Sequence, residues 1–133
     1  MYIPVILGTA RKGRQSEKVA RFILAEVKKA GLETELLDVR DYRLEATDNT
    51  GEPRQAKKLA GKISPADALI IEQLRQVVAE FSLVPIHSVL YFPNVQDCFN
   101  ESGEVKDAAY YKRVKAFLDE LVSYAKLLKA GKG

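Results

Sequence analysis

The sequence predicts an α/β domain in which a parallel sheet is covered by helices on both faces, and three observations support this fold class. Short apolar runs alternate with segments of helical periodicity, in the order β-α-β-α-β-α-β-α. The first run, YIPVILG, is apolar almost throughout, as in a strand buried on both faces. The chain has 133 residues, the size of one domain, and shows neither an internal repeat nor a linker. We therefore expect a single domain over residues 1–133.

The first strand is followed by a well-marked helix. Ser16 can cap a helix that continues to about Ala30, and Gly31 ends it. Apolar side chains at helical spacing predict its inward face. These residues are Val19, Phe22, Ile23 and Val27.

A second strand and a second helix come next. The run ETELLDV predicts the strand, and a polar segment with several turn-forming residues follows it. Pro53 then opens a short helix. We expect Ala56, Leu59 and Ala60 to face inward on that helix.

The stretch ADALIIEQLRQVV, residues 66–78, joins a strand to a helix without a connection. Residues 66–71 suit a buried strand because ALII contains two consecutive β-branched residues, and the residues from Glu72 onward suit a helix. Connections of this kind usually have about 2–6 residues. A single helix from Pro65 to Phe81 is an alternative, because Ser64 is a suitable cap and Pro65 a suitable first residue.

The last third of the chain predicts one more strand and one more helix. The run HSVLYF, residues 87–92, is the strand, and a loop continues from Pro93 to Gly103. A long helix is expected from Asp107 to about Lys129, with apolar residues at helical spacing.

Composition limits the possible classes of function. The chain is 47% hydrophobic and 29% charged, with a formal net charge of +3 and basic residues spread along its length, so we expect no nucleic-acid binding. No apolar run approaches the roughly 20 residues of a membrane span. Cys98 is the only cysteine, which excludes an intramolecular disulfide. These features predict a soluble cytoplasmic protein that does not bind membranes.

The stretch GTARKGRQSEKVA, residues 8–20, has the features of an anion-binding loop. It leaves a buried strand and enters a helix whose first amides have no intrahelical partner. Glycines allow a tight turn, and hydroxyl and guanidinium groups can donate to phosphate oxygens. The lysine of a nucleotide-hydrolase loop and the G-x-G-x-x-G spacing are both absent. The loop therefore suits a terminal phosphate, although a solvated basic loop is the alternative.

These residues also carry a resemblance to a known family. PVILGTARKGRQSEKVA, LLDVRDYRLEATDNTGEP and the later EQLRQVVAEFSLVPIHSVLYFPNVQDCFNESGEVKD are similar to the flavodoxin-like, NAD(P)H-dependent FMN reductases. In that family the loop wraps the FMN phosphate. The resemblance implies that the phosphate contacts are Thr9, Arg11, Arg14, Gln15 and Ser16.

The resemblance also shows what this chain lacks. After the strand near Ile71 the family continues with a loop of the type S-P-E-Y-N-x-x-x-P-G along the flavin ring, then a helix, a strand and a second glycine-rich loop. None of these follows Ile71 here. The resemblance therefore implies a shortened flavodoxin-like three-layer sandwich, with four parallel strands in the order 2-1-3-5 in place of five. FMN binding would be weak or lost.

A partner chain would compensate for part of this loss. A sheet with an empty position exposes strand edges, which invite pairing or exchange of segments. We expect a homodimer, formed with or without exchange of a segment.

Two functions follow from the resemblance. In the first, the chain is a reductase that passes electrons from NAD(P)H through FMN to a quinone, azo or metal acceptor, with no side chain acting as acid or base. In the second, it is a non-catalytic flavodoxin-like module, a natural or engineered deletion variant that has lost flavin binding.

Other candidate residues favour structural roles. His87 has no second histidine or neighbouring cysteine for a zinc site, and Cys98 has no neighbouring base. Tyr91 and Phe92 can either touch a ligand or pack in the core. Four carboxylates after the second strand are explained more simply by turn chemistry than by a metal. These are Asp38, Asp41, Asp48 and Glu52.

Overall fold

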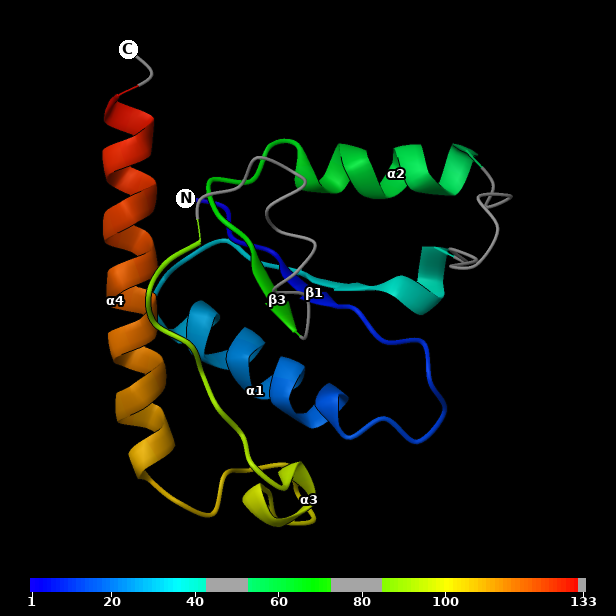
Figure 1. Ribbon diagram of the computed structural model, residues 1–133, viewed down its shortest axis with the longest axis vertical. Helices are drawn as coiled ribbons and strands as arrows, with labels where there is room; N and C mark the ends of the chain where they lie inside the picture. Colours follow the sequence, from blue (N-terminus) through cyan, green and yellow to red (C-terminus); the bar gives the residue numbers. More distant parts are fainter. Residues whose placement is uncertain (43–52, 73–84, 132–133) are drawn as a thin grey trace.

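The computed structural model describes residues 1–42, 53–72 and 85–131 (Figure 1). Its strands and helices alternate as far as β3, and a short and a long helix follow later in the chain. In chain order they are β1 (Val5–Leu7), α1 (Ser16–Lys29), β2 (Leu36–Asp38), the 3-10 helix η1 (Val39–Tyr42), α2 (Pro53–Ile63), β3 (Ile70–Glu72), α3 (Val95–Cys98) and α4 (Ala109–Ala130).

The described strands form one parallel sheet in the order β2-β1-β3. β1 lies in the centre, with Val5 opposite Leu36 of β2 and Ile70 of β3. The sheet confirms the predicted parallel α/β architecture and the first three positions of the expected order. The expected fourth strand is absent from the described part of the sheet.

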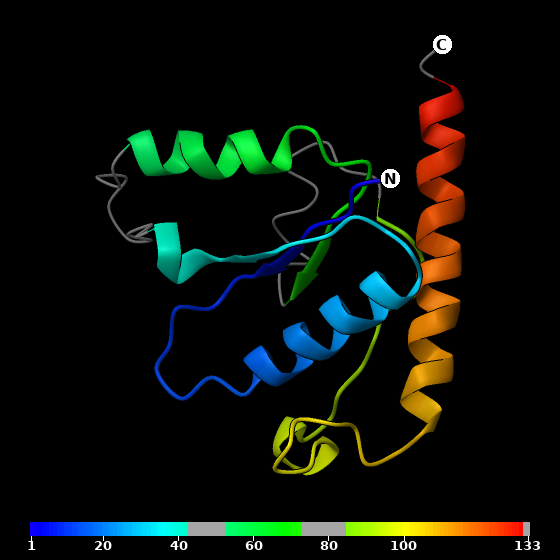
Figure 2. The same ribbon diagram turned by 180° about the vertical axis from the view of Figure 1, so that it is seen from behind.

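Helices cover both faces of this sheet, as the three-layer prediction requires. α2 lies on one face, and α1 and α4 lie on the other, where α4 runs beside the sheet and α1 (Figures 1 and 2). A large apolar cluster joins β1, α1 and α4, and its most buried members include Leu7, Val27 and Val114. A smaller cluster lies under α2 and contains Ile6 and Leu37. Alternate residues of β1 therefore enter the two clusters.

Helix α1 follows its prediction closely. Phe22, Ile23 and Val27 are buried, and Val19 packs against the large cluster. Gly31 has a φ of +73°, and its N–H donates to the carbonyl of Lys28 at 3.0 Å. A left-handed residue just after the last turn is the usual way to end a helix, and glycine adopts it without steric penalty.

Helix α2 begins at Pro53 as predicted, but its inward face differs. Leu59 and Ile63 pack against the smaller cluster, whereas Ala56 and Ala60 are exposed. The prediction for these two alanines is wrong because the helix meets the sheet along a narrower stripe than the sequence indicated.

The junction after β3 supports the strand interpretation. Ile70–Glu72 pairs with β1, so a helix that begins at Pro65 and includes these residues is excluded. The predicted strand started at residue 66, four residues before the observed one. The helix expected after it lies outside the described residues, apart from Glu72, which ends β3.

The segment 87–92 was predicted as a strand and is not one. Its backbone N–H groups at His87 and Ser88 donate to the carboxylate of Glu120 on α4. Leu90 and Phe92 pack against the large cluster. The apolar residues of this run therefore reach the core between helices, without joining the sheet.

The expected loop and helix of the last third are largely confirmed. Residues 93–103 contain the single-turn helix α3, and α4 ends within one residue of the predicted Lys129. Across residues 1–42, 53–72 and 85–131, no helix combines the length and the apolar character needed to cross a bilayer.

Candidate anion-binding site

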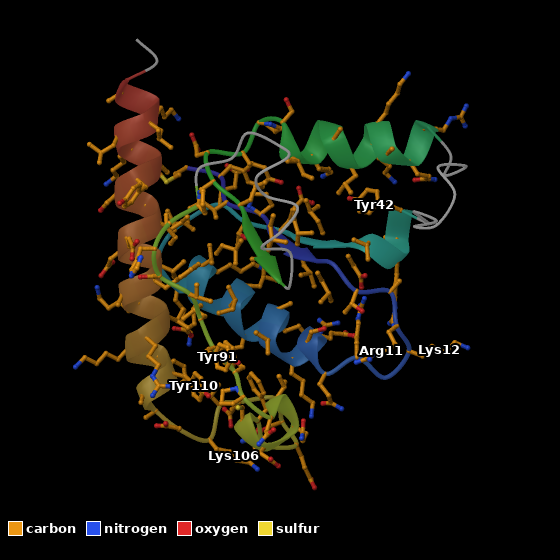
Figure 3. All side chains as sticks on the ribbon, viewed as in Figure 1. Arg11, Lys12, Tyr42, Tyr91, Lys106 and Tyr110 are labelled. Carbon is orange, nitrogen blue, oxygen red and sulfur yellow. The ribbon has the colours of Figure 1, made fainter. Side chains whose placement is uncertain are left out.

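The candidate site is the loop between β1 and α1. It begins at Gly8, where β1 ends, and the register places Leu7 beside Asp38, the last residue of β2. Gly13 has a φ of +66°, which favours glycine and turns the chain toward α1. Figure 3 shows Arg11 and Lys12 on the outer side of this loop, well apart from Tyr91 and Tyr110. The loop therefore lies at the carboxyl edge of the sheet, where ligands bind in open α/β folds.

The first turn of α1 has no side-chain cap. Gln15 occupies the N-cap position with helical dihedrals (φ −79°, ψ −22°) and makes no capping hydrogen bond. Ser16, predicted as the cap, is instead the first residue of the helix. The prediction of a serine cap is wrong because the backbone is already helical at Gln15. The first amides of α1 and the positive end of its dipole are consequently available to an anion.

Two buried polar atoms at the start of α1 have no hydrogen-bond partner among the described residues. They are the hydroxyl oxygen of Ser16 and the Nε atom of Arg14. Buried polar groups are nearly always hydrogen-bonded, so two such atoms in residues only two positions apart need an explanation. Both are donors, and an anion in the loop is a group that both can bind.

The rest of the Arg14 guanidinium is bound within the protein. Arg14 is only 8% exposed, and both of its Nη atoms donate to the carboxylate of Asp38. The distance from Nη1 to Oδ1 is 2.8 Å. Nη1 also donates to the carbonyl of Thr9 at 2.6 Å, and Glu17 lies 3.5 Å from Nη2. Hydrogen bonds from Arg14 hold the pKa of Asp38 below its usual range, and the same pair raises the pKa of Arg14. The pair therefore remains charged at neutral pH.

A second arginine holds the outer part of the loop. Arg40, in η1, donates through Nε to the carbonyl of Ala10 at 3.2 Å and through Nη2 to the carbonyl of Arg11. Its backbone N–H donates to Asp38 at 3.0 Å. Sequence reasoning missed Arg40 and the partner of Arg14. The detectable signal was Asp38 itself, an acid at the end of a strand expected to lie beside the first one.

The other predicted site residues are more accessible. Thr9 is half-buried, and its Oγ1 accepts a weak hydrogen bond from the N–H of Arg11 at 3.4 Å. The side chains of Arg11 and Gln15 are exposed. The five predicted residues thus lie in one loop and at the start of one helix. Both Nη atoms of Arg14, however, bind Asp38.

The remaining candidates lie elsewhere. Phe92 stacks on Tyr110, with ring centroids 4.7 Å apart, whereas Tyr91 is 77% exposed. His87 is also exposed. Cys98 is buried, with Sγ 3.2 Å from the carbonyl of Pro93.

Metal binding has no support in the described residues. Within them, no group of three or more histidine, cysteine or acidic side chains is placed to hold a metal ion. Asp48 and Glu52 lie outside this part of the chain.

Comparison with known proteins assigns the chain to a family. The sequence model of NADPH-dependent FMN reductases matches residues 1–73, which include β1, the candidate loop, α1, β2, α2 and β3. The match ends one residue after β3. A comparison with curated proteins found no match. The matched region is more than half of the 133 residues, and the chain belongs to the NADPH-dependent FMN reductase family.

Proposed function

We propose that this chain binds FMN through the β1–α1 loop and acts as an NAD(P)H-dependent FMN reductase. The observation that carries the proposal is the pair of buried donors, Ser16 Oγ and Arg14 Nε, that have no partner among the described residues. They lie in the loop and helix start of the region that the family model matches. A phosphate monoester accepts hydrogen bonds from several directions, so one group can satisfy both donors.

Each predicted residue has a role in this arrangement. Ser16 donates its hydroxyl proton to a phosphate oxygen, and the first amides of α1 donate from the backbone. Arg11 supplies a permanent positive charge at the solvent side. Thr9 and Gln15 add polar contacts at the ends of the loop. Arg14 contributes Nε–H, while its two Nη atoms keep the loop in shape through Asp38 and the carbonyl of Thr9.

When FMN is bound, its ring accepts hydride from NAD(P)H and passes electrons to a quinone, azo or metal acceptor. The protein has to bind the phosphate, orient the ring and leave space for a second planar molecule. None of these tasks requires an acid or a base. This agrees with the composition of the loop. Its polar side chains can donate hydrogen bonds to phosphate, and the two nearby acids are paired with arginines.

A second copy of the chain would help to enclose the ring. The resemblance implies that the ring-binding loops of the family follow the third strand, and the family match ends at residue 73. β3 is the last strand of the described sheet and pairs with β1 only. We propose that the chain forms a homodimer in which the second copy covers one face of the flavin ring. Light scattering at micromolar concentration tests this directly, and a monomeric mass contradicts it.

The first test of FMN binding is a titration that follows the quenching of flavin fluorescence, with riboflavin in parallel. We expect saturable binding of FMN at micromolar concentration and no binding of riboflavin, because the phosphate supplies the main contacts. NADPH oxidation is measured next on the FMN-loaded protein. If FMN does not bind at tens of micromolar, the enzyme function is wrong for this chain and the non-catalytic module is the better description.

A matched pair of serine variants locates the site. Ser16→Ala removes one charge-assisted hydrogen bond, worth about 1.5–3 kcal/mol, so we expect about 10- to 100-fold weaker FMN binding. Ser123→Ala makes the same change on α4, where the hydroxyl donates to the carbonyl of Asp119. That control should bind FMN like the wild type. Equal affinities of all three proteins would place the phosphate elsewhere.

A further inference from the structure

One carboxylate contacts both arginines that bind the candidate loop, the first through its guanidinium and the second through its backbone N–H. Asp38 is the last residue of β2, and its oxygens accept hydrogen bonds from both Nη atoms of Arg14 and from the backbone N–H of Arg40. The Arg14 side chain is 3% exposed and that of Asp38 18% exposed. The pair is therefore mostly shielded from water. In such a place charge-assisted hydrogen bonds hold the two side chains in a fixed geometry.

The two arginines bind three consecutive carbonyls of the loop. Arg14 donates to the carbonyl of Thr9, and Arg40 donates to those of Ala10 and Arg11. In a trans peptide, the C=O and the following N–H point in opposite directions. The amides that follow these carbonyls therefore point away from the arginine that binds each of them.

This orientation matters for an anion. Carbonyl oxygens repel phosphate, and amide hydrogens attract it, so a loop binds phosphate well only when its carbonyls are turned away. Here the carbonyls are bound by two arginine side chains. Asp38 in turn binds the guanidinium of Arg14 and fixes the backbone of Arg40 through its N–H. Asp38 thereby acts on the ligand indirectly, first through the arginines and then through the loop peptides that they bind.

We propose that Asp38 is a positioning residue for the phosphate site, required for FMN affinity although its own charge repels phosphate. This inference rests on the proposed function, because it assumes that the ligand of the loop is the FMN phosphate. It makes a prediction opposite in sign to simple electrostatics. Removal of a nearby negative charge should strengthen the binding of an anion, whereas loss of a positioning residue should weaken it.

Asp38→Asn tests the sign. The asparagine keeps the shape of the side chain but holds Arg14 with fewer and weaker hydrogen bonds. We expect the Kd for FMN to rise at least tenfold. Asp41→Asn is the matched control, because it removes the same charge from an exposed residue three positions along the chain. That control should bind FMN like the wild type or slightly more tightly. Equal or tighter FMN binding by Asp38→Asn overturns the inference.

A second variant guards against a folding failure of Asp38→Asn. Arg40→Lys keeps the positive charge on an exposed residue but loses the planar fork that binds two carbonyls. We expect a several-fold higher Kd for FMN with an unchanged melting temperature. If Asp38→Asn does not fold and Arg40→Lys binds FMN as the wild type does, the inference is likewise overturned.

A measurement without flavin separates this inference from the proposed function. Amide hydrogen exchange of the peptide that covers residues 8–16 should be faster in Asp38→Asn and Arg40→Lys than in wild type and Asp41→Asn. If wild type does not bind FMN but this difference is present, the proposed function is wrong and the positioning of the loop stands. If FMN binds and exchange is equal in all four proteins, the inference fails alone.

Discussion

The carboxylate of Glu120 accepts a hydrogen bond from the backbone N–H of His87, with Oε1 lying 3.0 Å from the amide nitrogen. The same oxygen lies 3.4 Å from the amide nitrogen of Ser88, and the Ser88 hydroxyl donates to the other oxygen. These hydrogen bonds, the Ser88 hydroxyl first, lower the pKa of Glu120. A side chain of α4 therefore satisfies backbone donors that a neighbouring strand would otherwise bind.

Removal of this carboxylate should loosen the segment 85–92. We expect Glu120→Ala to speed amide hydrogen exchange at His87 and Ser88 by about tenfold or more, because both amides lose a charged acceptor. Asp119→Ala is the matched control, since Asp119 is exposed and pairs with Lys115 at 2.7 Å. Unchanged exchange in Glu120→Ala would mean that apolar packing alone holds the segment.

Neighbouring aromatic residues at the end of this segment should differ sharply in their effect on stability. Phe92 stacks on Tyr110 and Phe99 and meets the edge of Phe22, whereas Tyr91 is 77% exposed. We expect Phe92→Ala to lower the free energy of unfolding by about 3 kcal/mol, at the lower end of the usual range because the ring is half-buried. Tyr91→Ala should change it by less than about 0.5 kcal/mol.

Urea denaturation with a common m-value measures both changes. A comparable loss in the two variants would contradict this assignment of the core and would indicate that Tyr91 is covered in solution, for example by a second chain.

The contrast between segments 16–31 and 87–92 shows what sequence alone can predict here. α1 was predicted with its buried face and its glycine stop, because helical periodicity and capping are local properties. The run HSVLYF has the composition of a strand, but composition does not determine which part of the chain it will contact. Its partner is Glu120, 32 or 33 residues away, and no local rule identifies that contact.

The candidate site shows the same division. Gly8, Thr9 and Ser16 are recognisable from their order in the chain, and the loop lies where the predicted topology requires. The role of Arg14 depends on Asp38, 24 residues later, which the parallel pairing of β1 and β2 brings alongside. The sequence therefore predicted Arg14 as a phosphate ligand but not that both of its Nη atoms bind an acid.

Two glycines offer a test of the loop that separates stability from binding. Gly13 and Gly31 both have positive φ, +66° and +73°, and an added Cβ would meet no atom within 4 Å at either position. Alanine at either site should therefore lower stability by a similar amount, about 1–2 kcal/mol, through backbone strain alone. Only Gly13→Ala should also weaken FMN binding, because Gly31 follows the last turn of α1, at the opposite end of that helix from the loop.

Thermal unfolding and the FMN titration measure these two effects on the same samples. An equal loss of FMN affinity in both variants would mean that binding follows global stability and not the shape of the loop.

We expect the free energy of unfolding to decline at alkaline pH because of Tyr2. Its hydroxyl donates to Glu35 at 2.7 Å, and Lys62 binds the same carboxylate at 3.1 Å. Burial first, and then the hydrogen bond and charge of Glu35, raise the pKa of Tyr2 to about 12. A pKa that is higher in the folded state than the ordinary value of 10.0 favours the neutral phenol in the folded protein. The stabilisation is therefore complete below pH 10 and is lost between pH 10 and about 12.

Tyr2→Phe removes this titration, and its stability should fall less steeply over the same interval. Because solvent screens the charges around a half-exposed ring, we expect the difference between the two proteins to be about 1 kcal/mol. Tyr124→Phe, on the exposed side of α4, is the matched control and should follow the wild type. Urea denaturation across this pH range measures the three curves. Parallel curves for wild type and Tyr2→Phe would show that the phenol titrates alike in the folded and unfolded chains, and that Glu35 is held by Lys62 alone.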